Sequence, residues 1–263
     1  MSTPEPQKQP TIGVLLIHGL NGSRHDLAEM EALLQTHGLL THNMLLPGHG
    51  THVRDLMALG WSDWERAVHH ELEALQQRCD RVFLVGHCLG GALALHAAAH
   101  TEVAGVVSMC SPLQMYPGLK LGVSLLRRVI PALPTIREDV RDPRARGGYT
   151  RGVYRWTALA PTESLLQFLP QLEAELPQIT VPVLVMASQH DHVIPVNDGR
   201  KIYARLGSQQ KELLIVHRSF HVIMKDYDRA EVCSRTVAFI QHYASLSGGA
   251  TGLIPVRSIA PLP

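Results

Sequence analysis

The chain has 263 residues, of which 45% are hydrophobic and 18% are charged, and its formal net charge is +1. This length and composition predict one sizeable globular domain, and the near-neutral charge argues against a surface that binds nucleic acid. Met1 to Gln9 lack the apolar core of a secretory signal, and no apolar run reaches the roughly twenty residues of a membrane span.

The cysteines favour a reducing compartment. Four are present, and none has the paired spacing that is typical of zinc ligands or of a disulfide framework. They are Cys79, Cys88, Cys110 and Cys233. We therefore expect a soluble cytoplasmic protein with no metal and no other cofactor.

Strand and helix patterns alternate along the chain. Apolar, β-rich segments predict strands, and segments with helical spacing and capping residues predict helices. In chain order they are strand 11–17, helix 23–37, strand 39–46, helix 62–75, strand 82–85, a helix up to about residue 100, strand 103–110, strand 183–187, helix 195–206, strand 211–216 and helix 229–243. This alternation predicts an α/β fold with a mostly parallel sheet of about six strands and helices on both faces.

One segment, 113–179, interrupts the alternation. It holds short helical patterns broken by prolines and no convincing strand, so we expect a helical cap over the carboxyl edge of the sheet. The core is then formed by 11–112 and 180–246, and the ends, 1–10 and 247–263, are expected to be flexible.

The expected cap is rich in basic residues. Between Lys120 and Arg155 there are nine basic and three acidic residues. A solvated helical surface is the simpler interpretation, and a face that attracts an anionic substrate or partner is the alternative.

Gly86-His87-Cys88-Leu89-Gly90 has the form of a nucleophile elbow, with cysteine where serine is usual. The flanking glycines suit a turn from strand to helix so tight that the backbone of the nucleophile is strained. A buried structural cysteine packed between two glycines would give the same short match. The elbow therefore needs support from an acid and a base elsewhere in the chain.

An acid and a base occur where the fifth and sixth predicted strands end. Asp191 follows strand 183–187, and His221 follows strand 211–216. The order nucleophile, acid, base along the chain is that of the α/β-hydrolase arrangement. Other histidines and carboxylates are poorer candidates. His217 lies before the loop has turned, and His190 and His192 flank Asp191. Asp226 is too near His221, and Asp198 and Asp63 do not follow a strand end.

Five motifs carry a family resemblance. They are Leu15-Leu16-Ile17-His18-Gly19-Leu20-Asn21-Gly22, Leu46-Pro47-Gly48-His49-Gly50, Gly86-His87-Cys88-Leu89-Gly90-Gly91, Gln189-His190-Asp191-His192-Val193-Ile194-Pro195 and Phe220-His221-Val222. With them the chain resembles the α/β-hydrolase superfamily from about Gly13 to Tyr243, and within it the bacterial carboxylesterases and monoacylglycerol lipases. The resemblance is weakest across the expected cap.

This resemblance implies an α/β-hydrolase fold and assigns further roles. It implies that the backbone amides of Leu20 and Leu89 form the oxyanion hole. It also implies a structural role for the loop motif around His49. Residues that would support the elbow and the oxyanion loop are His18, Gly19, Gly86, His87 and Gly90.

The departure from this resemblance is Cys88, because these esterases carry serine there; the Gly-x-Cys-x-Gly-Gly setting looks more like dienelactone hydrolases. Either the chain is a natural thiol hydrolase, which we prefer, or it is a serine enzyme whose nucleophile was replaced. We expect hydrolysis of small to medium acyl esters through an acyl-thioester on Cys88, with His221 as general base and acid and Asp191 fixing its tautomer.

Several alternatives stay open. The same triad would serve an acyltransferase or a thioesterase, and the fold would also serve a ligand-binding protein without catalysis. A metal-dependent hydrolase is the weakest alternative, because the histidines do not fall at a recognisable ligand spacing. The expected partner is a small-molecule ester, and the oligomeric state is open. Apolar cap residues either line an acyl pocket or, as we prefer for most, anchor the cap: Leu113, Met115, Leu119, Leu121, Val123, Leu125 and Leu126.

Overall fold

A computed structural model of the protein describes residues 10–135, 138–149 and 154–246. The expected flexible ends, 1–10 and 247–263, lie outside these residues except for Pro10.

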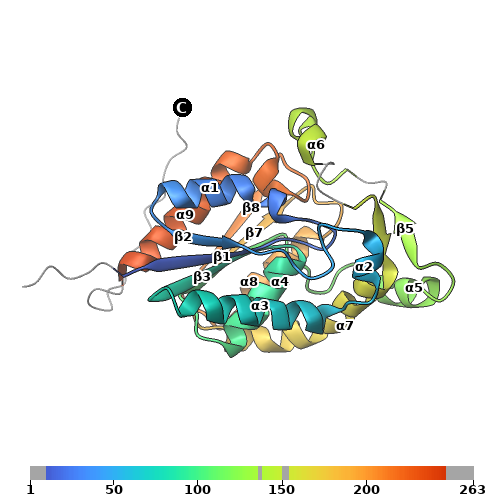
Figure 1. Ribbon diagram of the computed structural model, residues 1–263, viewed down its shortest axis with the longest axis horizontal. Helices are drawn as coiled ribbons and strands as arrows, with labels where there is room; N and C mark the ends of the chain where they lie inside the picture. Colours follow the sequence, from blue (N-terminus) through green and yellow to red (C-terminus); the bar gives the residue numbers. More distant parts are fainter. Residues whose placement is uncertain (1–9, 136–137, 150–153, 247–263) are drawn as a thin grey trace, which may run out of the picture.

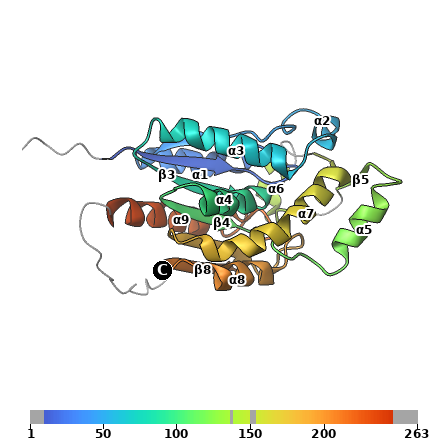
Figure 2. The same cartoon turned by 90° about the horizontal axis from the view of Figure 1, so that it is seen from below.

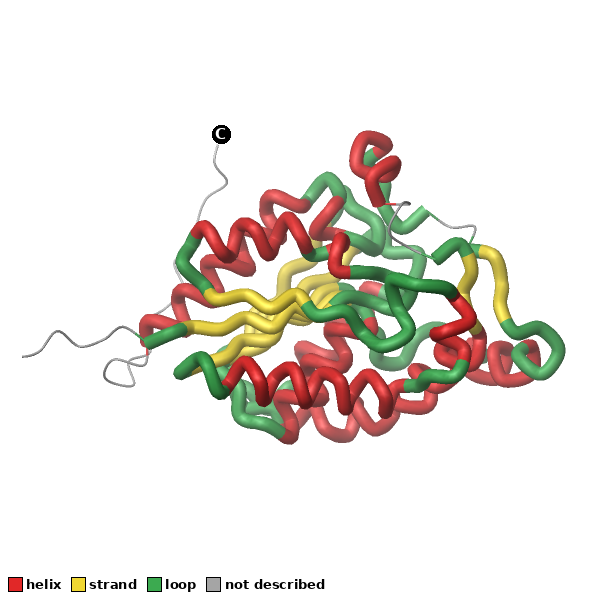
Figure 3. Tube along the Cα trace, in the orientation of Figure 1, coloured by secondary structure: helices red, strands yellow, loops and turns green. Residues whose placement is uncertain are grey.

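The core is a six-stranded sheet in which every pair of neighbours is parallel (Figures 1 and 3). The strands lie in the order β2-β1-β3-β4-β7-β8. They are β1 (Ile12–Ile17), β2 (Leu40–Asn43), β3 (Arg81–His87), β4 (Gly105–Met109), β7 (Val183–Ser188) and β8 (Lys211–Val216). The predicted parallel sheet of about six strands is confirmed.

Helices cover both faces of the sheet, which explains the continuous apolar strands. On one face, Val14 and Leu16 of β1 pack with α1 (Ala28–Thr36) and α9 (Arg229–Ser245). On the other face, Leu15 and Ile17 of the same strand contribute to a second core. The helices of that second face are α3 (Trp61–Gln76), α4 (Leu89–His100), α7 (Leu159–Glu175) and α8 (Val196–Arg205), as Figure 1 shows for α3, α4 and α8.

Two helix starts differ from the sequence-based expectation. The predicted helix 23–37 is a 3-10 turn, η1 (Arg24–Asp26), followed by α1, although Ser23 and Asp26 do form the expected capping box. Ser62 does not cap α3; the helix begins one residue earlier, because the Asp63 carboxylate accepts the backbone N–H of Gly60 at 2.9 Å. A short helix, α2 (Val53–Met57), was not expected.

The segment between β4 and β7 adds helices and one small hairpin. It contains α5 (Leu119–Leu126), β5 (Ala132–Pro134), α6 (Pro143–Tyr149), β6 (Trp156–Ala158), α7 and the 3-10 turn η2 (Leu176–Gln178). The expectation that it has no strand is wrong, because β5 and β6 form an antiparallel pair of three residues each, too short for a strand pattern to be read. Figures 1 and 2 show α5 and β5 beyond the carboxyl ends of the sheet strands.

The apolar residues of this segment divide by position. Leu113 and Val123 are buried in the second core. Leu121 and Leu125 of α5 are 65% and 54% exposed. The anchoring interpretation therefore suits the first pair, and the second pair lies on the surface. None of the helices within the described ranges is both long enough and apolar enough to cross a membrane.

Part of the basic charge of the same segment is engaged in contacts within the protein. Arg127 forms an ion pair with the buried Glu163 of α7, and Arg146 pairs with Glu138. Such pairs are typical of a structural role, which favours the simpler interpretation for these arginines.

Candidate active site

Cys88 occupies a sharp turn between β3 and α4. The strand ends at His87 and the helix begins at Leu89, and Cys88 has φ 53° and ψ −119°, a conformation that residues with a side chain rarely adopt. A Cβ at Gly86 would lie 2.2 Å from the Gly90 carbonyl oxygen, and a Cβ at Gly90 would lie 2.1 Å from the carbonyl oxygen of Ile17. Glycine is thus required on both sides of the turn, as the elbow motif predicts.

His221 and Asp191 form a buried hydrogen-bonded pair. The His221 Nδ1–H donates to Asp191 Oδ2 at 2.7 Å. The other oxygen of Asp191 accepts the backbone N–H groups of Val193 at 2.7 Å and Ile194 at 2.9 Å. These bonds fix the carboxylate, and the carboxylate in turn fixes the tautomer and the orientation of the imidazole.

The electrostatics of this pair favour a charged imidazole. Burial would lower the pKa of His221, but the Asp191 carboxylate and the sulfur of Cys88 act in the opposite direction and hold it well above its usual value. Burial would raise the pKa of Asp191, but His221 and the two backbone N–H groups lower it below its usual value. Cys88, His221 and Asp191 therefore lie close enough together to influence one another at the carboxyl ends of β3, β8 and β7.

His18 holds the loop that follows β1. Its Nδ1–H donates to the Gly19 carbonyl oxygen at 2.9 Å, and its Nε2 accepts the N–H of Leu46 at 3.1 Å. Burial, with a smaller effect of His49, lowers the pKa of His18 to about 3, so the ring is neutral at ordinary pH. Because both ring nitrogens are bonded to backbone, His18 is not free to act as a base.

The loop that His18 holds passes directly beside the elbow. A Cβ at Gly19 would lie 3.0 Å from the Cβ of Cys88. Leu20 comes next in this loop, and Leu89 is the first residue of α4, where a backbone N–H has no acceptor within the helix. The two amides expected to form the oxyanion hole thus belong to segments on either side of Cys88.

His87 supports the loop that carries His221. The His87 Nε2–H donates to the His221 carbonyl oxygen at 3.1 Å, and the two rings lie 4.6 Å apart. Burial, together with the charge of His221, lowers the pKa of His87 to about 3. This neutral imidazole is a positioning group behind the elbow.

The competing carboxylates have other partners. Asp226 accepts backbone N–H groups of Arg141, Asp142 and Phe220, and Asp63 caps α3. Asp198 accepts the three consecutive N–H groups of residues 113–115 at the start of the inserted segment. The competing histidines at positions 190, 192 and 217 are exposed.

Cys110 is a second thiol at the site that sequence reasoning did not assign. It follows β4 directly and has φ 47°. Its sulfur, an oxygen of Asp191 and a ring nitrogen of His221 all lie within 4.8 Å of one another. Burial raises the pKa of Cys110 to about 12, so it stays protonated. A sequence signal was available, because Cys110 ends predicted strand 103–110, which follows the elbow strand along the chain. In the structure His87 of β3 pairs with Met109 of β4, and this pairing brings Cys110 beside the elbow.

Comparison with known proteins places this geometry in context. The family model for serine aminopeptidase, S33, matches residues 8–228. The thermostable monoacylglycerol lipase of Bacillus sp. (strain H-257) is 29% identical over 237 residues, covering 89% of this chain and 92% of the lipase. The carboxylesterase of Bacillus subtilis (strain 168) is 24% identical over 236 residues, covering 87% and 92%.

Solved structures agree with these relatives. One of the metagenome-derived lipolytic enzymes LipS and LipT superposes with a TM-score of 0.79 at 29% identity, covering 89% of this chain and 95% of that one. A soluble variant of the Saccharomyces cerevisiae monoglyceride lipase has a TM-score of 0.77 at 18% identity, covering 91% and 88%, and this likeness concerns the fold alone. The expected α/β-hydrolase fold is confirmed.

Proposed function

Since the chain belongs to the serine aminopeptidase, S33, family and is an ester hydrolase, we propose that it cleaves its substrates with Cys88 as nucleophile, His221 as general base and acid, and Asp191 as the orienting carboxylate. The observation that carries the proposal is the buried His221–Asp191 hydrogen bond of 2.7 Å beside a cysteine held at φ 53° in the elbow. This combination is the activated-nucleophile arrangement: nucleophile, base and orienting group.

The first chemical step forms a thioester. The proton of Cys88 first passes to His221 Nε2, whose raised pKa favours the protonated ring, and the sulfur then attacks the carbonyl carbon of the ester. The carbonyl oxygen becomes an oxyanion, which accepts hydrogen bonds from the amides of Leu20 and Leu89. His221 then gives its proton to the leaving alkoxide oxygen, and the acyl group stays on sulfur. Helix α4 supports this step, because its N-terminal end favours negative charge at Cys88.

The second step hydrolyses the thioester. Water attacks the acyl carbon while His221 takes one of its protons, and the tetrahedral intermediate again places its oxyanion at Leu20 and Leu89. The carbon–sulfur bond breaks, the acid leaves and the proton returns to Cys88. Asp191 stays charged throughout, because its role is to stabilise the imidazolium rather than to accept its proton.

The substrate proposal is a carboxylic ester with a small to medium acyl chain. It rests on the likeness to a monoacylglycerol lipase and a carboxylesterase. We also propose that the enzyme works in a reducing compartment such as the cytoplasm, because a nucleophilic Cys88 must remain a free thiol.

The test is intact-mass spectrometry of the protein mixed with p-nitrophenyl acetate or butyrate, with nitrophenol release followed in parallel. An acyl adduct that appears and decays on Cys88 during steady release supports the proposal. An adduct that persists after one turnover would instead indicate a serine enzyme whose nucleophile was replaced. Release that is unchanged in Cys88→Ala would contradict the proposal, and Cys110→Ala is the matched control for the neighbouring thiol.

The same assay separates the remaining activities. With an amine or alcohol added, acyl transfer appears as a new acylated product and hydrolysis appears as free acid. An aminoacyl p-nitroanilide tests the peptidase activity that the family description names. Because esters are easier acyl donors than amides, we expect the ester to be cleaved faster by a thiol.

A further inference from the structure

A second group of titratable side chains lies between α4 and α7. His96 and His100 are four residues apart on α4, so they lie on one face of the helix, and Glu175 is the last residue of α7. His96 Nδ1 lies 2.7 Å from Glu175 Oε2, and His100 Nε2 lies 3.0 Å from Glu175 Oε1. One ligand atom from each residue lies within 4.8 Å of the others. The i, i+4 spacing of His96 and His100 is a ligand spacing that the sequence analysis did not single out.

The surroundings hold these side chains in place. The His96 ring packs edge-on against Trp61 at 5.8 Å and against Phe168 at 5.4 Å. The Glu175 side chain is only 8% exposed and also accepts a hydrogen bond from Gln171 Nε2 at 2.9 Å. Ligands that are oriented by neighbours need little reorganisation to bind an ion.

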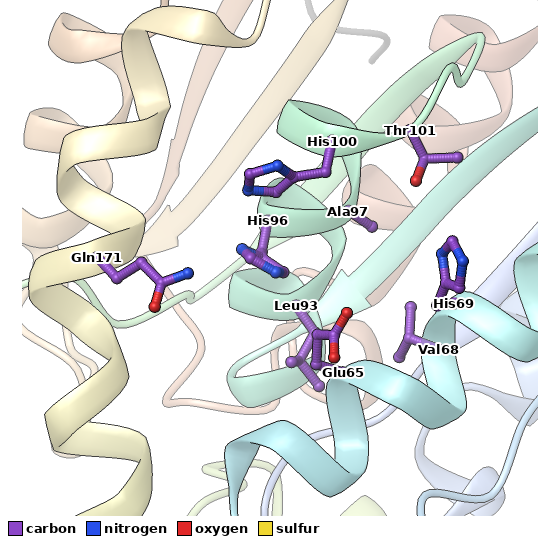
Figure 4. A pocket seen from close by; sticks show the side chains of 9 residues that line it. All are labelled: Glu65, Val68, His69, Leu93, His96, Ala97, His100, Thr101 and Gln171. Atoms are coloured by element: carbon purple, nitrogen blue, oxygen red, sulfur yellow. The ribbon is translucent and has the colours of Figure 1, made fainter.

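The cluster borders a cavity of about 320 Å³. Figure 4 shows His96 and His100 on α4 beside this cavity, with Gln171 of α7 on one side and Glu65 and His69 of α3 on the other. The cavity gives an ion access from solvent and leaves room for water as a further ligand.

The helix ends supply a further reason for a cation here. His100 is the last residue of α4 and Glu175 is the last residue of α7, so the C-terminal ends of two helices meet at the cluster. A helix C-terminus carries partial negative charge and favours a cation within its last turn.

We propose that His96, His100 and Glu175 bind a divalent transition-metal ion, with Zn²⁺ as the best match. Two imidazole nitrogens and one carboxylate oxygen are ligands that Zn²⁺ accepts, and water in the cavity completes the tetrahedron. With metal–ligand distances of about 2.0–2.2 Å, tetrahedral ligand atoms lie ~3.3 Å apart. The three ligand atoms now lie within 4.8 Å of one another, so no pair has to close by more than about 1.5 Å to reach this geometry.

The ion joins the elbow helix to α7 without entering the chemistry of ester cleavage. His100 stands eleven residues beyond Leu89 on α4, a distance of about 16 Å along the helix axis. The expected effect is therefore on the stability of the α4–α7 contact. The simpler alternative is that Glu175 only accepts hydrogen bonds from two histidines, and metal binding distinguishes the two.

The experiment is calorimetric titration of the chelator-treated, full-length protein with ZnCl₂, together with melting temperatures with and without the ion. We expect one ion per chain at this site and a rise in Tm of about 3–8 °C at saturating zinc. His100→Ala removes one ligand from a half-exposed position and should weaken binding by at least about 10-fold and abolish most of the rise in Tm. The matched control is His70→Ala, an exposed histidine of α3, which should bind zinc like the wild type.

Zinc at the active-site thiols must be separated from zinc at this cluster, because Cys110, Asp191 and His221 also lie within ligand distance. Cys110→Ala resolves this: binding that persists in Cys110→Ala and is weakened at least about 10-fold in both His100→Ala and Glu175→Gln supports the proposal. The proposal is overturned if the wild type binds no zinc, if His100→Ala binds it as tightly as the wild type, or if Cys110→Ala alone abolishes binding. None of these readouts depends on ester cleavage.

Discussion

A histidine–carboxylate pair lies at each end of α4, and we propose a different role for each. At the N-terminal end, His221 Nδ1 lies 2.7 Å from a carboxylate oxygen of Asp191; at the C-terminal end, His96 Nδ1 lies 2.7 Å from one of Glu175. What lies next to each histidine–carboxylate pair differs. The first imidazole lies beside the strained Cys88, whereas the second pair is joined by His100 and borders an open cavity.

The surroundings of the two pairs differ in what holds the carboxylate and in the charge that the nearby helix end favours. Asp191 is fixed by two backbone N–H groups, and the N-terminal end of α4 favours the negative charge of a developing oxyanion. Glu175 accepts hydrogen bonds from the side chains of His96, His100 and Gln171, at a helix end that favours a cation. The direction of the helix thus favours opposite charges at its two ends.

Removal of the nucleophile should have the largest effect. We expect Cys88→Ala to lower kcat/KM for p-nitrophenyl butyrate by about 10³-fold or more, because the proposed acceptor of the acyl group is removed. Its melting temperature should stay near that of the wild type, since alanine keeps the Cβ in the elbow. Full turnover by the alanine variant, measured as nitrophenol release, would show that the residue at the N-terminal end of α4 is not the nucleophile.

The orienting carboxylate should come next. In Asp191→Asn the amide no longer selects the Nδ1–H tautomer or stabilises the imidazolium, and we expect kcat to fall by about 10²–10⁴-fold with a smaller change in KM. Single-turnover acylation followed by mass spectrometry measures the step directly. A variant that acylates at the wild-type rate would show that His221 is held without Asp191.

The pH dependence of stability separates histidines with a carboxylate partner from those without one. Burial is the main cause that lowers the pKa of His18 and His87 to about 3 and that of His49 to about 4. These rings stay neutral in the folded protein below pH 6.5, whereas the unfolded chain binds protons there, so stability falls as the pH falls from about 6.5 towards 4. Burial also raises the pKa of Asp26 to about 6, which offsets one of these protons.

His221 and Asp191 contribute in other pH windows. The raised pKa of His221 adds stability that is fully present below about pH 6.5 and is lost as the pH rises through its folded value. The lowered pKa of Asp191 adds stability that is present above about pH 4 and is lost as the pH falls through its folded value. Between pH 6 and 4, unfolding lets His18, His49 and His87 take up about three protons and lets Asp26 release about one. We therefore expect a net uptake of about two protons on unfolding, or about 2.7 kcal/mol per pH unit.

Urea unfolding at a series of pH values measures this slope. Replacing His87 by glutamine should flatten the curve by about one proton, or about 1.4 kcal/mol per pH unit, because one buried neutral imidazole is removed. A curve with the wild-type slope in His87→Gln would mean that His87 takes up its proton in the folded protein. Substitution of His70, a histidine with an exposed side chain, serves as the control for the loss of a histidine as such.

The sequence predicted best what is local in the chain. The elbow, Asp191 and His221 could be assigned because each follows an apolar strand, and the carboxyl ends of parallel strands meet at one edge. Contacts between distant segments gave no such signal: Glu175 lies 79 residues from His96, and its pairing depends on how α7 returns across α4. The β5–β6 hairpin was missed for a different reason, because three residues per strand are too few for a periodic pattern.

The smallest effect is expected from the matching substitution at the other end of α4. Glu175→Gln makes the same carboxylate-to-amide change as Asp191→Asn, yet kcat/KM should stay within about 2-fold of the wild type, because Glu175 lies at the far end of the helix from Cys88. Loss of charge-assisted hydrogen bonds to His96 and His100 should lower Tm by about 3–6 °C. A large loss of activity with unchanged Tm would reverse the comparison, because the C-terminal pair would then act on the elbow through α4 rather than join two helices.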